Sequence, residues 1–204
     1  MFPVLSLAVV GTFTGCLSRP AIDHQTFALS AESTTQNTNA TGRGVLMLRS
    51  VQVSPLFEHR SFVYRVGPDM YESDPYSEFI IPPGRALSIP VRACLQNSGV
   101  FEDVVESTSE IQPDSTLEVH ARELYGDFRK PAEPAAVLAL TLWLFETPAG
   151  ENHKLIYHKD YARRVALKDR TPVALAAGWN QALSEIMTQA CADIASARGK
   201  TIAR

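Results

Sequence analysis

The longest regular hydrophobic patterns lie in the second half of the chain. Residues 116–128, 135–146 and 153–166 each have the length and composition of a long β-strand. Their connections are short: residues 129–134 contain two prolines, and residues 147–150 contain a proline and a glycine. Successive strands with such short connections pair antiparallel, so we predict a three-stranded meander.

A pattern of helical period follows this meander. Thr171 is a typical helix N-cap residue, and Pro172 suits the first helical position. The residues that follow form one continuous apolar stripe, made of Leu175, Trp179, Ala182, Leu183, Ile186, Met187, Ala190, Cys191 and Ile194. Because such a stripe has to be buried, we expect this helix to lie on a sheet.

Residues 83–97 form a second predicted helix. Its apolar side chains, Leu87, Val91, Cys94 and Leu95, recur at spacings of three and four, and residues 97–99 supply a helix stop. Pro90 interrupts the pattern, so we expect either a kink or a late start.

The first half of the chain contains shorter predicted strands. These are residues 45–53, 61–66 and 100–105, together with 70–81, which carries a break at Asp74-Pro75. With the meander and the two helices they indicate an α+β fold, an antiparallel sheet with two helices packed on one face. We place this domain at residues 44–198, followed by a C-terminal tail at 199–204.

The N-terminal segment indicates export. Residues 2–15 are apolar and uncharged, and too few to cross a membrane as a helix. The stretch Phe13-Thr14-Gly15-Cys16 reads as a lipobox, so we predict a lipoprotein signal peptide at 1–15 and lipidation of Cys16. No Lys or Arg precedes this stretch, and Phe13 stands where leucine is more usual. Two alternatives are an ordinary cleaved signal peptide and a buried apolar N-terminus with an incidental cysteine.

Residues 16–43 are predicted to be a flexible tether. Ser, Thr, Asn, Gln, Ala and Gly dominate it, and such a composition buries too little apolar surface to offset the entropy of ordering. Within it, residues 25–29 have the pattern of a short strand that docks onto the domain.

Composition and motifs exclude several functions. The formal charge of −3 and the pI near 6.0, with no long basic run, argue against a nucleic-acid partner. The chain contains neither a Gly-x-Ser-x-Gly elbow nor a phosphate loop. His153 and His158 are expected on opposite faces of a strand, whereas Glu118 and His120 share a face and are the one candidate acid–base pair. We therefore expect no enzymatic activity, no metal and no other cofactor.

Cys94 and Cys191 form an even pair once Cys16 carries lipid. Both are predicted on the apolar faces of helices. They would form a disulfide if the helices lie side by side, and otherwise they are two buried thiols.

An aromatic segment offers a candidate contact surface. Its members are Tyr64, Arg65, Tyr71, Asp74, Tyr76 and Phe79. Amphipathic aromatic side chains of this kind line grooves and subunit interfaces, and Arg65 and Asp74 are expected to pair there. The alternative is that the tyrosines only cover the edge of the core.

Residues 51–83 resemble a known family. The stretches 51–65 and 71–79, with Val63-Tyr64-Arg65 and Asp74-Pro75-Tyr76, resemble the ABC-type transport auxiliary lipoproteins, a group that includes the PqiC-like lipoproteins. Residues 25–29 are similar to the short segment that follows the lipobox in that family. The likeness in the order of elements extends over most of residues 16–195.

This resemblance implies an accessory of lipid transport in the cell envelope. Family members are lipid-anchored, face the periplasm, and work with an ABC transporter whose substrate-binding subunit carries mammalian-cell-entry (MCE) domains; some form homo-oligomers. Leu17 follows Cys16, where an aspartate commonly retains lipoproteins in the inner membrane, so we expect the outer membrane. The alternatives are a periplasmic lipid-binding lipoprotein with its own apolar pocket and an envelope hydrolase with a non-standard site.

Overall fold

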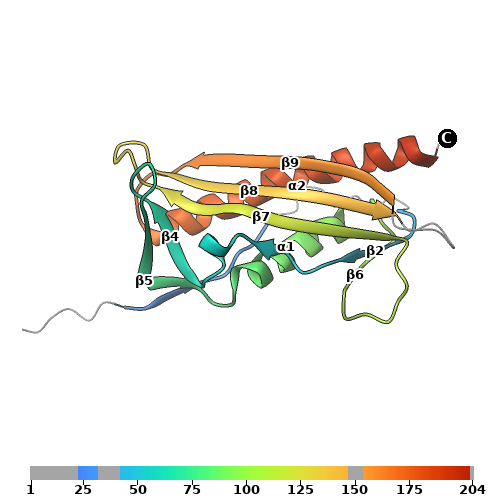
Figure 1. Cartoon of the computed structure of the whole chain (residues 1–204), viewed down its shortest axis with the longest axis horizontal. Coiled ribbons are helices and arrows are strands. Elements are labelled where there is room, and N and C mark those ends of the chain that lie inside the picture. Colours follow the sequence, from blue (N-terminus) through green and yellow to red (C-terminus); the bar gives the residue numbers. More distant parts are fainter. Residues whose placement is uncertain (1–22, 32–41, 147–153, 203–204) are drawn as a thin grey trace, which may run out of the picture.

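Three long antiparallel strands form the centre of the sheet. The structure is a computed structural model that describes residues 23–31, 42–146 and 154–202. The meander consists of β7 (Ser115–Asp127), β8 (Ala135–Glu146) and β9 (Lys154–Ala166). β8 pairs antiparallel with β7 on one side and with β9 on the other (Figure 1). The predicted meander is confirmed.

Shorter strands occupy the other edge of β7. They and their neighbours are β1 (Gln25–Phe27), β2 (Val45–Leu48), β3 (Gln52–Val53), β4 (Ser61–Arg65), β5 (Tyr71–Phe79) and β6 (Asp103–Glu106). β2, β3 and β4 pair in parallel with the beginning, middle and end of β7, respectively. β6 then adds parallel to β2, β5 antiparallel to β4, and β1 parallel to β5.

The predicted α+β class is confirmed, but the sheet is mixed rather than antiparallel throughout. The reason is the position of helix α1 (Pro83–Ser98), which follows β5 and leads into β6. A connection of this length allows the chain to cross over, so that β6 runs parallel to β2. Helical periodicity does not reveal where such a crossover ends.

Two predicted strands are divided or distorted. The expected strand at 45–53 is two strands, β2 and β3, separated at residues 49–51. β5 is continuous through Asp74-Pro75, but its register shifts there: Ser61 lies opposite Glu78, whereas Val63 lies opposite Ser73. The expected break is therefore a bulge, which keeps the strand attached to β4.

The two helices have well-defined ends. α1 continues through Pro90 and stops at Gly99, whose φ of 66° is left-handed, so the expectation of a late start is wrong. The second helix, α2 (Pro172–Ile202), starts as predicted: the Ala174 amide donates to Thr171 Oγ1 at 3.2 Å. α2 extends to Ile202, so residues 199–202 of the predicted tail are helical.

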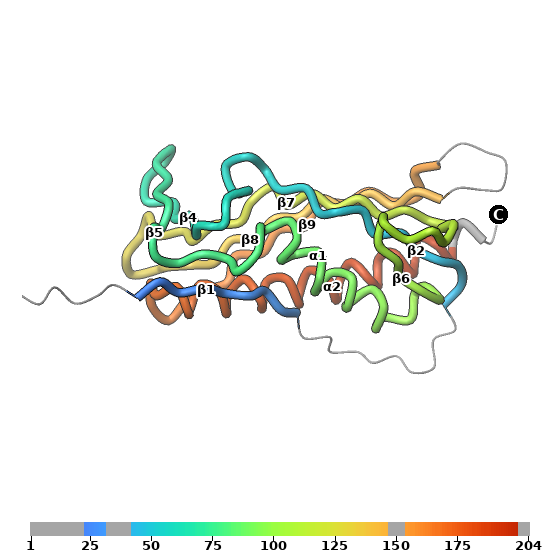
Figure 2. Tube along the Cα trace, turned by 90° about the horizontal axis from the view of Figure 1, so that it is seen from below, coloured from blue at the N-terminus to red at the C-terminus, as the bar shows by residue number. Residues whose placement is uncertain are grey.

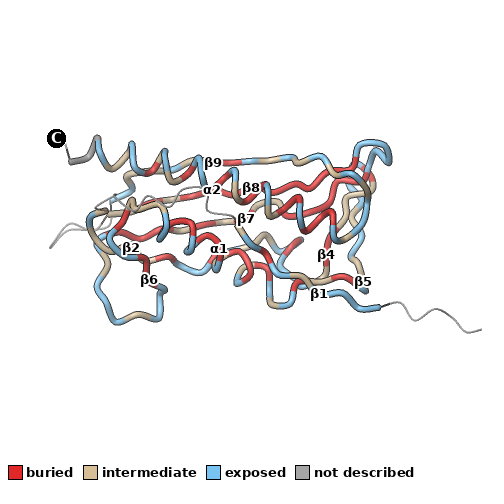
Figure 3. Tube along the Cα trace, turned by 180° about the vertical axis from the view of Figure 1, so that it is seen from behind, coloured by how far each residue is buried: buried red, intermediate tan, exposed pale blue. Residues whose placement is uncertain are grey.

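The core lies between the sheet and the helices. Both helices cover the same face of the sheet (Figure 1), and Figure 3 shows buried segments along the strands and along the helix sides that meet them. Leu140, Leu142 and Leu144 of β8 and Leu183 and Ile186 of α2 have no exposed surface. Every residue of the predicted α2 stripe is buried except Cys191, which is partly buried.

The short strand that precedes the domain in sequence, β1, completes the sheet edge. β1 docks on β5, and the Ser30 amide donates to Asn180 Oδ1 of α2 at 2.9 Å. The docking of a short strand at 25–29 is confirmed for residues 25–27. Cys16 lies outside the described residues. Among the described residues, no helix combines the length and apolar character that a membrane span requires.

Candidate functional site

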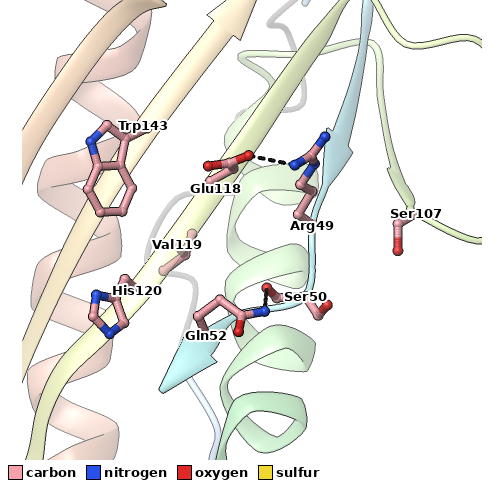
Figure 4. Close-up of a pocket in the computed structure, with 8 residues that line it drawn as sticks. All are labelled: Arg49, Ser50, Gln52, Ser107, Glu118, Val119, His120 and Trp143. Atoms are coloured by element: carbon pink, nitrogen blue, oxygen red, sulfur yellow. Dashed lines mark hydrogen bonds and ion pairs between the residues drawn. The ribbon is translucent and has the colours of Figure 1, made fainter. Parts of the chain in front are cut away.

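A groove lies on the sheet face that the helices leave uncovered. It has a volume of about 570 Å³ and is lined by Arg49, Ser50, Gln52, Ser107, Glu118, Val119, His120 and Trp143. Figure 4 shows Glu118, His120 and Trp143 on neighbouring strands of the meander, beside Arg49 and Gln52 of the β2–β3 segment.

The interruption between β2 and β3 builds this groove. Arg49 follows β2 directly and its amide still bonds to Leu117 O of β7 at 3.0 Å. Its guanidinium donates to Glu118 Oε1 at 2.7 Å. Side chains two residues apart on a strand share a face, so Glu118 and His120 project from β7 into the same groove.

Aromatic and polar side chains continue the site across the meander. Trp143 stacks on His158 of β9, with ring centroids 5.4 Å apart and an interplanar angle of 9°. Next to them, Thr141 Oγ1 donates to Asp160 Oδ1 at 2.5 Å, and this hydrogen bond holds the pKa of Asp160 below its usual range. The exposed face of β7–β9 thus offers the aromatic plane of Trp143 among charged and hydrogen-bonding groups.

A second hollow of about 240 Å³ adjoins the groove at Arg49, Ser50 and Ser107. It lies between the β2–β3 segment and α1, and Leu48, Val51, Pro82 and Ile89 form its apolar part. α1 approaches the strand segment closely here: a Cβ on Gly84 would lie 2.5 Å from Val51 O. Arg49 also lines a smaller hollow beside Phe145, so it is the centre of a connected surface.

The candidate acid–base pair is engaged in contacts within the chain. Glu118 and His120 share a face as predicted, but the Glu118 carboxylate is engaged by Arg49, and His120 Nε2 lies 3.4 Å from Ser54 Oγ. Among the described residues, no three His, Cys, Asp or Glu side chains converge to hold a metal ion. His153, which we expected on the opposite face to His158, lies outside the described residues. An aromatic plane beside an ion pair suits recognition of a partner surface.

The predicted aromatic contact residues do not form one surface. Phe79 is 2% exposed and packs in the core, with its ring centroid 4.8 Å from Phe62 and 5.4 Å from Trp179. Tyr76 is 40% exposed and meets His24 edge to face. Of these two residues, only Tyr76 is placed to meet a partner.

Tyr64 and Asp74 form a local pair. Tyr64 Oη donates to Asp74 Oδ2 at 2.5 Å, while Asp74 Oδ1 accepts from the amides of Tyr76 and Ser77. Burial, together with the Asp74 carboxylate, raises the pKa of Tyr64 above its usual range. Partial burial acts to raise the pKa of Asp74, but these hydrogen bonds outweigh it and lower that pKa. The pair fixes the β5 bulge to β4.

Arg65 is occupied elsewhere, so the expected Arg65–Asp74 pair is wrong. Its guanidinium donates to Pro68 O and lies 5.6 Å from the centre of the Tyr71 ring. Tyr71 in turn meets Tyr125 edge to face at 5.8 Å and Phe57 at 6.1 Å. This cluster anchors the β4–β5 hairpin on β7, which agrees with the alternative that tyrosines cover the edge of the core.

The two cysteines come from neighbouring helices. Cys94 of α1 is buried, Cys191 of α2 is partly buried, and both are free thiols in the structure. Burial, with a smaller effect from Cys191, raises the pKa of Cys94 to about 11. The disulfide between them stays a prediction.

Sequence reasoning missed Arg49, Gln52 and Trp143. A charged residue directly after the apolar stretch 45–48 was the available signal for Arg49. No sequence signal marked Trp143 as a site residue, because a tryptophan among the leucines and alanines of 135–146 is typical of a buried core strand.

The comparisons with known proteins concern the fold. No protein-family model matches the chain, and no curated protein matches its sequence. A crystal structure of a Xanthomonas campestris protein of family DUF330 is similar with a TM-score of 0.73 and 14% identity, covering 89% of this chain and 98% of that one. The crystal structure of an uncharacterized protein is similar with a TM-score of 0.62 and 15% identity, covering 85% and 97%. At these identities the likeness shows a shared fold.

Proposed function

We propose that this protein is a non-enzymatic envelope lipoprotein, anchored through Cys16, that serves as an auxiliary component of an ABC-type, MCE-associated lipid transport system. The lipobox and the resemblance of residues 51–83 support this proposal.

The groove at Arg49 is the observation that carries the proposal. It is large enough for side chains of a partner, since ligand sites typically measure roughly 300–1,000 Å³. Its Arg49–Glu118 pair is half-exposed and can exchange partners. We assign it as the surface that docks the MCE-domain subunit at the membrane.

The anchor is tested by substitution of Cys16. In cells labelled with radioactive palmitate, the Cys16→Ser variant should lose the label and leave the outer-membrane fraction. Cys94→Ser is the matched control and should retain both, because Cys94 lies inside the domain. Unchanged labelling of Cys16→Ser would remove the anchor from the proposal.

Docking is tested by co-purification of the full chain with the MCE-domain subunit in detergent. Arg49→Glu places two carboxylates together in the groove, and Trp143→Ala removes its aromatic plane; each should lower the recovered partner about tenfold or more, the size expected of a central contact residue. Lys168→Glu, at the far end of the meander, is the charge-reversal control. Equal recovery with all three variants would exclude the groove as the docking surface.

The second hypothesis is a lipid-binding lipoprotein with its own pocket. The apolar hollow beside α1 favours it, although about 240 Å³ is small for a ligand site. Stoichiometric lipid that co-purifies with the full Cys16→Ser chain and is lost in Ile89→Asp would support this function over docking.

A further inference from the structure

Three turns come together at one end of the domain. The β4–β5, β7–β8 and β9–α2 connections lie at the end where β1 also begins (Figures 1 and 2). The Phe128 amide donates to Arg65 O at 2.9 Å, and the Leu167 amide donates to Pro134 O at 2.8 Å. Arg170 lies 4.8 Å above the Phe128 ring. The three turns, residues 66–70, 128–134 and 167–171, are therefore one continuous surface, here called the turn end.

Apolar and basic side chains project from the turn end. Met70 is 62% exposed, and Val173, in the first turn of α2, is 61% exposed. The side chains of Lys130 and Lys168 are 72% and 83% exposed. A surface that offers isolated apolar side chains beside flexible basic ones suits the interface of an anionic bilayer.

Charge distinguishes the two ends of the domain. The three turns carry four basic side chains, Arg129, Lys130, Lys168 and Arg170, and three acidic ones, Asp69, Glu133 and Asp169. At the opposite end, β6 and the loop before β7 occupy residues 102–114, which hold five acidic side chains and no basic one. Arg43, Lys154 and Arg198 also lie at that end, so it is the segment 102–114 that an anionic surface would repel.

The length of chain before β1 gives an independent constraint. Gln25 is nine residues after Cys16. Fully extended, that stretch spans about 30 Å at most. β7 alone, with 13 residues, is about 43 Å long at roughly 3.3 Å per residue. A lipid at Cys16 therefore keeps the end where β1 begins near the bilayer while β1 is docked.

We propose that the turn end rests on the headgroup layer of a bilayer that contains anionic phospholipid, with Lys130, Lys168 and Arg170 toward the phosphates and Met70 and Val173 at the interface. This inference rests on the lipid anchor of the proposed function. It fixes the orientation of the domain: α2 and the meander extend away from the bilayer, and the acidic end points into the periplasm.

The test is co-sedimentation of the full Cys16→Ser chain with vesicles, so that binding does not depend on the acyl chains. We expect binding to vesicles of phosphatidylglycerol and phosphatidylethanolamine but not to phosphatidylcholine vesicles. Each basic side chain near such a surface contributes about fivefold. Lys130→Gln with Lys168→Gln should therefore weaken partitioning about 25-fold. The matched control, Arg43→Gln with Lys154→Gln at the opposite end, should leave it unchanged.

Two results would overturn the assignment. One is binding without preference for anionic lipid, and the other is an equal loss in the control variant. The lipid anchor can fail separately. If Cys16 is labelled with palmitate but the chain shows no selective vesicle binding, only the membrane contact of the turn end is refuted. If the chain binds anionic vesicles selectively but Cys16 is not labelled, only the lipid anchor is refuted.

Discussion

At the scale of single residues, Asp127, the last residue of β7, accepts hydrogen bonds from two arginines. It is 2% exposed, its Oδ1 accepts from the amide and Nε of Arg129, and its Oδ2 accepts from Nη2 of Arg129 at 2.7 Å and from Arg164. The hydrogen bonds from Arg129 hold the pKa of Asp127 well below its usual range; burial opposes this, and Arg164 adds to it. One carboxylate thus joins the end of β7 to β9.

Asp127→Asn should lower the free energy of unfolding by about 2 kcal/mol at pH 7, because it removes the carboxylate charge that pairs with two guanidinium groups. The lowered pKa means that this stabilisation is present above about pH 4, the unfolded value, and is lost as the pH falls below it. Urea unfolding from pH 7 to 2.5 should therefore show the wild-type and variant curves converging in acid.

The matched control for Asp127 is Glu133→Gln in the turn that follows β7. Glu133 is 66% exposed and pairs with Lys130, so its loss should cost less than about 1 kcal/mol. A gap between wild type and Asp127→Asn that stays constant down to pH 2.5 would contradict the role given to the carboxylate.

At the scale of elements, α2 approaches the sheet closely at Gly178. A Cβ built there would lie 2.7 Å from the Ala136 Cβ of β8 and 2.6 Å from Leu167 Cδ2. Leu167 can rotate away, but Ala136 moves only with its strand. The packing of helix on sheet therefore depends on a residue that is unfavourable within a helix.

Gly178→Ala should be destabilising by about 1–3 kcal/mol from overpacking, in spite of a gain of about 1 kcal/mol in helix propensity. Gly199→Ala in the same helix is the control, because nothing lies within 4 Å of its built Cβ. That variant should be neutral or slightly more stable. Thermal and urea unfolding measure both, and two variants of equal stability would show that α2 is not held at this distance from β8.

At the scale of the whole molecule, Arg198 connects loops at the end of the domain that holds the acidic segment 102–114. Its Nη1 donates to Val100 O and its Nη2 to Arg43 O, both at 2.8 Å, and its guanidinium lies 4.4 Å from the centre of the Phe101 ring. The last turns of α2 therefore hold together two loops that are far apart in sequence.

Arg198→Lys should loosen the acidic end without melting the core, because a single ammonium group does not span two carbonyls. Hydrogen exchange should quicken at the Glu102 amide, which bonds to Gly44 O at 3.1 Å, and stay unchanged at Leu140 in the centre of β8. Arg92→Lys, which alters an exposed ion pair with Glu106, is the control. Equal acceleration at both amides would show that the effect is global.

Local pattern was sufficient for the longest elements, but not for the division of residues 45–53 into two strands. The meander, both helices and the Thr171 cap were predictable, because hydrophobic period and capping chemistry depend on residues near one another in the chain. The predicted lipidation of Cys16 and the family resemblance of residues 51–83 also come from the sequence, because both depend on local motifs and not on the fold.

Only the tertiary structure decided how the strands pair and which side chains meet. The parallel pairing of β2, β3 and β4 with β7 depends on the crossover through α1, and the Arg49 groove depends on that pairing. For the same reason, sequence did not reveal that Phe79 is a core residue, or that Arg65 donates to Pro68 O instead of pairing with Asp74. Contacts between distant residues are set by packing of the whole sheet, and local periodicity does not encode them.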